Sequence, residues 1–178
     1  RLQGDWSSDV CSSDLTMNPG EEGEVLLSTW WAYFTEMCDL LSASDPKRRV
    51  PWFGPDMGVM MFTTARQMET WSHGQDIFDL FGQTRVNGPR LKNIAVIGVR
   101  TYGWTFANRG LEPPGPAPYV RLTGPDGDIW EFNEVDQANK VEGDAAEFSH
   151  VVTQGRNIAD VNLTVRSEEH TSELQSPC

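Results

Sequence analysis

The stretch that decides the fold is residues 64–76, TARQMETWSHGQD. It lies inside a predicted helix over residues 58–80, and Gly82 follows as a C-terminal stop. Glu69 and His73 are four residues apart and therefore share a helix face, on which Asp76 also falls. Glu, His and Asp are side chains that bind Zn²⁺ or Fe²⁺. The stretch therefore predicts a helix that carries candidate metal ligands.

The surroundings of these side chains favour a buried site over a solvated one. Glu69, His73 and Asp76 lie in the middle of a stripe whose ends are apolar, and an unpaired buried charge is costly. The alternative is an ordinary helical Glu–His pair, which stabilises a helix by only about 0.2–0.5 kcal/mol. A catalytic metal site usually has a third protein ligand, which this stretch does not supply.

Two further helices are predicted on either side of this one. Apolar residues recur at helical spacing over residues 21–44, and Pro46 stops that run. A third helix is predicted from Pro89 to Asn108, ended by Arg109 and Gly110. Short joins between successive helices are typical of a helix bundle. Residues 16–112 are therefore expected to form part of a bundle.

The pattern changes after a stiff, proline-rich connector at residues 112–118. Two runs of period two, residues 119–122 and 128–132, flank Gly124-Pro125-Asp126-Gly127 and predict a β-hairpin. A short helix is predicted over residues 145–153, and residues 160–165 are expected to begin a strand. Residues 113–165 thus form a small, incomplete α/β unit, and the fold class is α+β.

Both ends of the chain resemble sequencing adapters translated in frame. Residues 4–15 and 166–176 have no apolar periodicity, and the two adapter strings whose translations they resemble are largely reverse complements of each other. Residues 1–15 and 166–178 are therefore interpreted as adapter-derived artefacts, the alternative being natural tails. Cys38 is then the single cysteine between them, and His73 and His150 are the two imidazoles.

Composition excludes several classes of function. The formal net charge is −12, whereas nucleic-acid binding requires clustered Lys and Arg. No run approaches the 18 apolar residues of a membrane span. The single cysteine between the two adapter-like ends, Cys38, provides no disulfide framework and suits a reducing cytosol. The sequence therefore predicts a cytoplasmic protein with neither nucleic acid nor membrane as a partner, and it leaves the oligomeric state open.

Four segments, residues 50–55, 64–76, 98–101 and 151–154, together resemble the actinobacterial metal-binding branch of the mycothiol-dependent maleylpyruvate isomerase superfamily. The resemblance implies a DinB-like four-helix bundle whose upstream helices are missing here. It also implies that Glu69 and His73 bind a divalent metal, usually zinc, and that a third ligand, a His, comes from an earlier helix. Mycothiol is the implied co-substrate.

The same resemblance suggests roles for other residues. Asp76 and Arg66 are expected to support the metal ligands rather than bind the metal. Arg100 and Arg156 are the candidates for contacting a small anionic substrate. The chain departs from the family pattern at Tyr102, where basic or small residues are common, and at Asn157, where His is common. His150 and Cys38 are interpreted as structural residues.

Two functional hypotheses follow, with a purely structural Glu–His pair as the third reading. The first is metal-activated, thiol-dependent isomerase or transferase chemistry in the full-length parent, with the chain itself inactive and a poor binder of metal. The alternative is a non-catalytic module that binds a metal or a small ligand.

Overall fold

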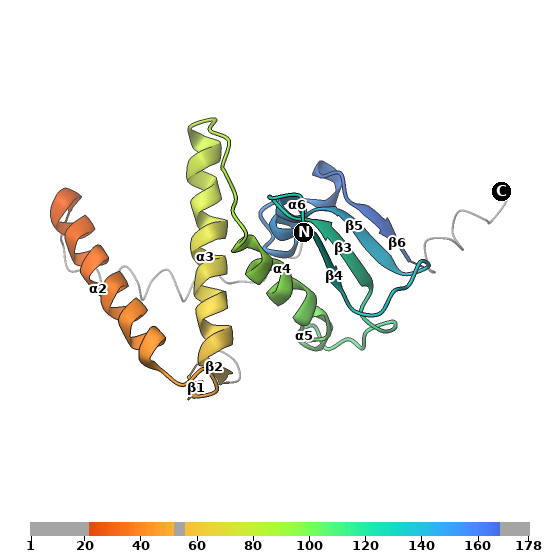
Figure 1. Cartoon of the computed structure of the whole chain (residues 1–178), viewed down its shortest axis with the longest axis horizontal. Helices are drawn as coiled ribbons and strands as arrows, with labels where there is room; N and C mark the ends of the chain where they lie inside the picture. Colours follow the sequence, from red (N-terminus) through yellow and green to blue (C-terminus); the bar gives the residue numbers. More distant parts are fainter. Residues whose placement is uncertain (1–21, 52–55, 168–178) are drawn as a thin grey trace. The chain divides into compact units, whose positions relative to one another are not determined.

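The computed structural model describes residues 22–51 and 56–167 of the 178-residue chain. Most of the two adapter-like ends therefore lies outside the described residues. The chain divides into two compact units, residues 1–45 and 46–178, and each is described by itself. Helices and a mixed sheet are both present, which confirms the expected α+β class (Figure 1). No helix in the described ranges is long and apolar enough to cross a membrane.

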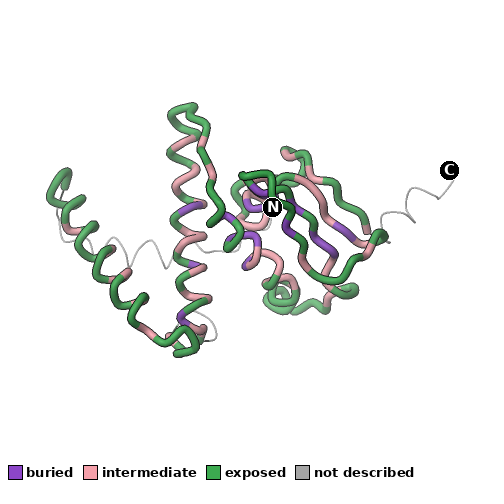
Figure 2. The backbone as a smooth tube through the Cα atoms, in the orientation of Figure 1, coloured by how far each residue is buried: buried purple, intermediate pink, exposed green. Residues whose placement is uncertain are grey.

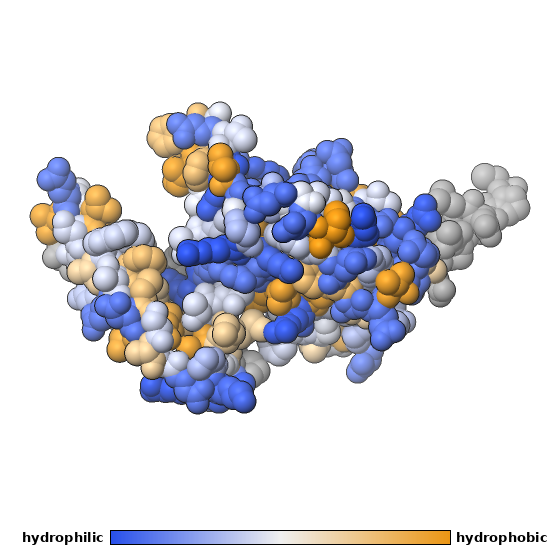
Figure 3. Space-filling model, viewed as in Figure 1, coloured by the Kyte–Doolittle hydropathy of each residue, from blue (hydrophilic) through white to orange (hydrophobic). Residues whose placement is uncertain are grey.

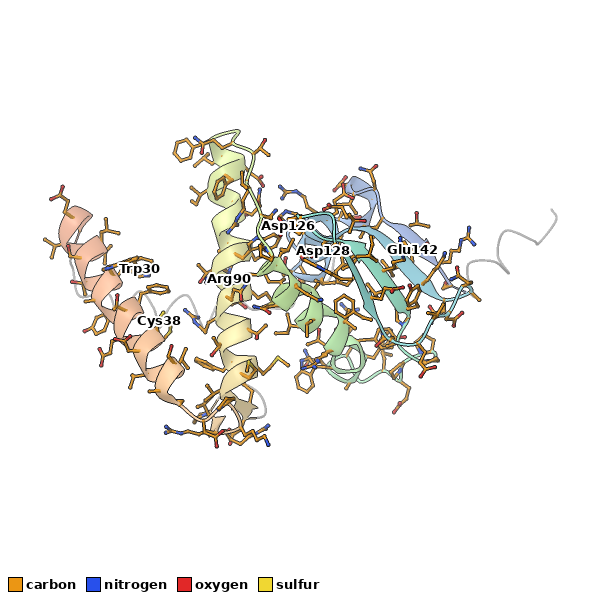
Figure 4. All side chains as sticks on the ribbon, in the orientation of Figure 1. Trp30, Cys38, Arg90, Asp126, Asp128 and Glu142 are labelled. Carbon is orange, nitrogen blue, oxygen red and sulfur yellow. The ribbon has the colours of Figure 1, made fainter. Side chains whose placement is uncertain are left out.

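The first unit contributes one helix, α2, Gly23–Ala43, close to the predicted range of 21–44. The helix ends at Ser44, whose amide and hydroxyl donate to the carbonyls of Leu41 and Leu40 in the last turn. Trp30 and Phe34, one turn apart, stack with their ring centroids 5.4 Å apart. Cys38 is a free thiol on the same helix (Figure 4).

The second unit begins with a long helix, α3, Val59–Leu80, as the sequence predicted. Two very short antiparallel strands precede it, β1 (Arg49–Val50) and β2 (Met57–Gly58). The helix buries Val59, Ala65 and Trp71 and leaves most other positions partly or fully exposed (Figure 2). Near its C-terminal end Ile77, Leu80 and Phe81 are exposed and contribute apolar surface there (Figure 3).

The predicted third helix, residues 89–108, is in fact two helices, and this is a correction. α4 spans Leu91–Arg100 and α5 spans Tyr102–Ala107. Thr101 separates them, with φ −88° and ψ 4°. Its hydroxyl donates to the carbonyls of Ile97 at 2.9 Å and Gly98 at 3.1 Å. A Thr hydroxyl that bonds the preceding turn in this way competes with the backbone ladder and bends a helix.

A four-stranded mixed sheet follows, with strand order β4-β3-β5-β6. Its strands are β3 (Tyr119–Thr123), β4 (Ile129–Phe132), β5 (Lys140–Asp144) and β6 (Thr164–Arg166). β3 and β4 form the predicted hairpin, with Asp126 and Asp128 at its tip (Figure 4). Gly127 has φ +83° in the turn, where a side chain would be strained. β3 and β5 are parallel, and the other two pairs are antiparallel.

The last helix, α6, Ala145–Val152, lies close to its predicted range of 145–153. Asp144 caps it by accepting hydrogen bonds from the amides of Ala146 at 2.8 Å and Glu147 at 3.0 Å. A single 3₁₀ turn, Ile158–Asp160, separates it from β6.

One hydrophobic core connects α3, α4, the sheet and α6. Its buried members are Trp71, Leu91, Ile94, Ala95, Val120, Leu122, Trp130, Ala145 and Phe148. α4 and α6 pack closely at Gly98, where an added Cβ would lie 2.6 Å from Cγ2 of Val152. The second unit is therefore held together by contacts between its helical part and its sheet.

Candidate functional site

Glu69 and His73 lie one turn apart on α3, as predicted. Nε2 of His73 is 3.3 Å from Oε2 of Glu69. The expectation of a buried site is wrong for the described residues, because the side chains are 41% exposed for Glu69 and 78% exposed for His73. α3 turns Met68 and Trp71 toward the core, which leaves the two polar residues on another side of the helix.

The spacing of the two donor atoms fits a shared metal ion. With ligand distances of about 2.0–2.1 Å for nitrogen and oxygen around Zn²⁺, two ligands of a tetrahedral site are about 3.3–3.4 Å apart. The observed 3.3 Å between Nε2 of His73 and Oε2 of Glu69 matches that value. It is also compatible with an ordinary ion pair between the same atoms. The pair could supply two ligands of a metal site.

Asp76 and Arg66, the predicted supporting residues, are both exposed on α3. Within residues 22–51 and 56–167, no group of three or more His, Cys, Asp or Glu side chains gathers closely enough to hold a metal.

The two predicted substrate contacts occupy different settings. Arg100 is the last residue of α4 and is exposed. Nη2 of Arg156 lies 2.5 Å from Oδ2 of Asp79, so it connects the segment after α6 to α3. A hydrogen bond from Gln75 and the bond from Arg156 hold the pKa of Asp79 below its ordinary value. Their roles in substrate binding stay predictions.

His150, on α6, contributes to packing. Its ring stacks on Trp71, with the ring centroids 4.5 Å apart. Burial lowers the pKa of His150 below its ordinary value, and the nearby charge of Arg156 lowers it further. A second cation, Arg85, lies with its Cζ 5.2 Å from the Trp71 ring centroid and donates to the Trp71 carbonyl at 2.6 Å.

The second unit contains a cavity of about 340 Å³ that was not predicted from the sequence. Its walls come from α4, α5, the segment before β3, the sheet and α6. Glu69, His73, Arg100 and Arg156 do not line it. No single stretch of sequence could have indicated it, since its residues are spread between positions 98 and 154. The pairing of Tyr102 with Phe106 one turn later, in edge-to-face contact at 5.1 Å, was the one local signal.

The candidate metal ligands, Glu69 and His73, lie within a segment that matches a known protein family. Residues 2–78 match the family described as mycothiol maleylpyruvate isomerase N-terminal domain. This match supports the resemblance to that superfamily. No solved structure matches the chain significantly.

Two relatives come from Mycobacterium tuberculosis, strains CDC 1551 / Oshkosh and H37Rv, and both are described as uncharacterized proteins. Each is 35% identical over 161 residues, which cover 90% of this chain and 61% of the relative. The chain thus spans about three fifths of the length of the curated relatives it matches.

Proposed function

Because residues 2–78 match the mycothiol maleylpyruvate isomerase N-terminal domain, we propose that the full-length parent of this chain binds a divalent metal, zinc above all, through Glu69 and His73. We propose further that the metal acts together with a low-molecular-weight thiol, which we take to be mycothiol. The chemistry would be an isomerase or transferase reaction on a small anionic substrate. A DinB-like four-helix bundle, of which α2 and α3 would be members, is part of this proposal.

The observation that carries the proposal is the 3.3 Å spacing of Nε2 of His73 and Oε2 of Glu69, within the matched region. The carboxylate would contribute a negative oxygen ligand and the neutral imidazole a nitrogen ligand, a donor set that suits Zn²⁺. Arg66 precedes Glu69 by three residues and therefore lies on the same side of the helix, one turn earlier.

A divalent metal bound here would make a coordinated thiol acidic enough to lose its proton at neutral pH. Both side chains are accessible from solvent, so a metal and a thiol can approach this face of α3 directly. Arg100 is exposed and free to meet an anionic substrate, whereas Arg156 would first have to leave Asp79.

The first test is the metal content of the purified full-length parent, compared among wild type, Glu69→Gln and His73→Gln. We expect stoichiometric metal in the wild type and a loss of affinity of at least about 10-fold in either variant, because each removes a ligand. Glu134→Gln, which removes an exposed carboxylate of the second unit, is the matched control and should keep the metal. A wild-type protein without stoichiometric metal would leave Glu69 and His73 as a helical pair and overturn the proposal.

The second test adds mycothiol to the cobalt-substituted protein and records the visible absorption spectrum. A change that saturates with mycothiol is expected if a thiol reaches the metal. A loaded protein whose spectrum does not respond would overturn the thiol chemistry and support the non-catalytic metal-binding module instead.

A further inference from the structure

The cavity in the second unit has the size and position of a ligand site of its own. Its volume of about 340 Å³ lies at the lower end of the roughly 300–1,000 Å³ typical of small-molecule pockets. It opens between the α4–α5 corner, the sheet and α6, and it shares no lining residue with the Glu69–His73 pair. A ligand of this cavity can therefore bind independently of a metal at Glu69 and His73.

The interior of the cavity is apolar and partly aromatic. The side chains that line it include Val99, Phe106, Val120, Val141, Phe148 and Val152. Val120 and Phe148 belong to the hydrophobic core and are 3% and 6% exposed, so this wall is fixed by packing. Phe106 comes from α5 and Phe148 from α6, so aromatic side chains line the cavity from two elements. Such walls favour a flat apolar group.

Three of the six polar side chains that line the cavity are already engaged in hydrogen bonds. The hydroxyl of Thr101 donates to Ile97 at 2.9 Å, and that of Thr105 donates to the Thr101 carbonyl at 3.0 Å. The side-chain amide of Asn133 donates to the carbonyl of Pro118 at 2.6 Å. These bonds hold the walls in place, and the hydrogens donated in them are not available to a ligand.

Arg109 is different, because its guanidinium has no ion-pair partner among the described residues. Asp and Glu outnumber Lys and Arg by 26 to 14 in the chain, yet none of the described carboxylates pairs with this cation. A guanidinium presents a planar fork of N–H donors that matches a carboxylate. At the edge of an apolar cavity it would select an anionic group.

The backbone has two unusual positions beside the cavity. Asn133, φ 64°, and Gln154, φ 63°, are the two non-glycine residues with positive φ in the described ranges, and both line the cavity. Gln154 follows the C-cap of α6. Its backbone N–H donates to the carbonyl of Val151 at 3.0 Å, and the backbone N–H of Gly155 donates to the carbonyl of His150 at 2.8 Å. Glycine is preferred at this helix-ending position. The chain instead keeps a long amide side chain there, at the cavity.

We propose that this cavity binds a small aromatic carboxylate, with the ring between Phe106 and Phe148 and the carboxylate paired with Arg109. The side-chain amide of Gln154 supplies a second polar contact near the cavity.

The test uses the whole chain after treatment with a chelator, so that its outcome does not depend on Glu69 and His73. The probes are phenylpropionate and phenylpropanol, which share a ring and a chain and differ in charge. Binding is located and measured from amide chemical-shift changes in NMR spectra. The variants are Arg109→Gln, Thr105→Trp, which fills the cavity from an exposed position of α5, and Arg121→Gln. Arg121 is the matched control, since it alternates with the buried Val120 and Leu122 and so lies on the other face of β3.

We expect saturable shifts in α4, α5, β3 and α6 with phenylpropionate, and an affinity for phenylpropanol that is lower by on the order of 10-fold, because one charge-assisted contact is lost. Arg109→Gln should reduce the affinity for phenylpropionate to that for phenylpropanol, whereas Arg121→Gln should leave it unchanged. Thr105→Trp should lower the affinity for both probes. The proposal is overturned if neither probe saturates, if the shifts centre elsewhere, or if the two arginine variants have equal effects. Failure of the metal tests would leave these outcomes unaffected.

Discussion

The imidazole of His150 lies against the indole of Trp71, with ring centroids 4.5 Å apart and planes inclined by 29°. Trp71 comes from the middle of α3 and His150 from α6, so this contact connects these two helices. The indole N–H donates to Oδ1 of Asn87 at 2.9 Å, which satisfies the only polar atom of the buried ring. The helix with the candidate metal ligands is thereby anchored to the fold by its opposite side.

Trp71→Ala should destabilise the second unit by about 3–5 kcal/mol, because a large buried ring is replaced by a cavity. Trp71 is 8% exposed. The free energy of unfolding in urea, followed by circular dichroism, measures the loss. The control is Trp104→Ala on α5, whose side chain is 51% exposed and whose removal should change stability by less than about 1 kcal/mol. Equal losses in the two variants would show that Trp71 is not part of a packed core.

Stability should fall as the pH drops below the ordinary pKa of histidine, with His150 as one cause. Burial and the charge of Arg156 lower the pKa of His150 in the folded chain, so the unfolded chain takes up this proton first. The stabilisation is then complete above the ordinary value of 6.5 and is lost as the pH falls through the lower folded value. His150→Phe keeps a ring on Trp71 without a titrating group, so urea titrations between about pH 7.5 and 5 should show a shallower decline. An unchanged decline in the variant would contradict this assignment.

Gly98→Ala should destabilise the second unit by about 1–3 kcal/mol, because its methyl group would meet Val152 at the α4–α6 contact. Val152→Ala in the same chain should restore part of the loss by making room. Gly103→Ala on α5 is the matched control, since nothing lies within 4 Å of an added Cβ there. It should stabilise its helix by up to about 1 kcal/mol. A lower midpoint of thermal unfolding for Gly103→Ala than for Gly98→Ala would refute the close approach.

Gln154→Gly should stabilise the chain by about 0.5–1 kcal/mol, because glycine adopts φ 63° without strain. The same change should weaken the binding of phenylpropionate, since it removes an amide from the cavity lining. Thr153→Gly is the control: Thr153 has φ −92° and its hydroxyl donates to Ser149 at 2.8 Å, so glycine there should not stabilise. A Gln154→Gly chain that gains no stability would show that the position is not strained.

Local signals in the sequence were sufficient for most of the helices and for the hairpin. The bounds of α3 followed from helical periodicity and from Gly82, and the β3–β4 hairpin followed from two alternating runs around a Pro-Asp-Gly turn. These elements form because their hydrogen bonds close over a few residues. The candidate pair of Glu69 and His73 was predictable for the same reason, since four residues along a helix fix two side chains on one face.

The sequence did not reveal β5 or the break at Thr101. β5 contains Lys140, Glu142 and Asp144 and has no clear apolar alternation, so it becomes a strand through its pairing with β3 and β6. The break at Thr101 depends on a hydroxyl that bonds two carbonyls of the preceding turn, which helical periodicity does not report.

The sequence by itself therefore determined which residues share a helix face, and with them the pair that could hold a metal. Only the tertiary structure decided that this pair is exposed while Trp71 is buried, and that Arg109, Phe106 and Phe148 surround one cavity. The physical reason is that burial is a property of contacts between elements far apart in the chain. The spacing of residues along one helix determines which side chains share a face. Packing against α4, α6 and the sheet determines which face is buried.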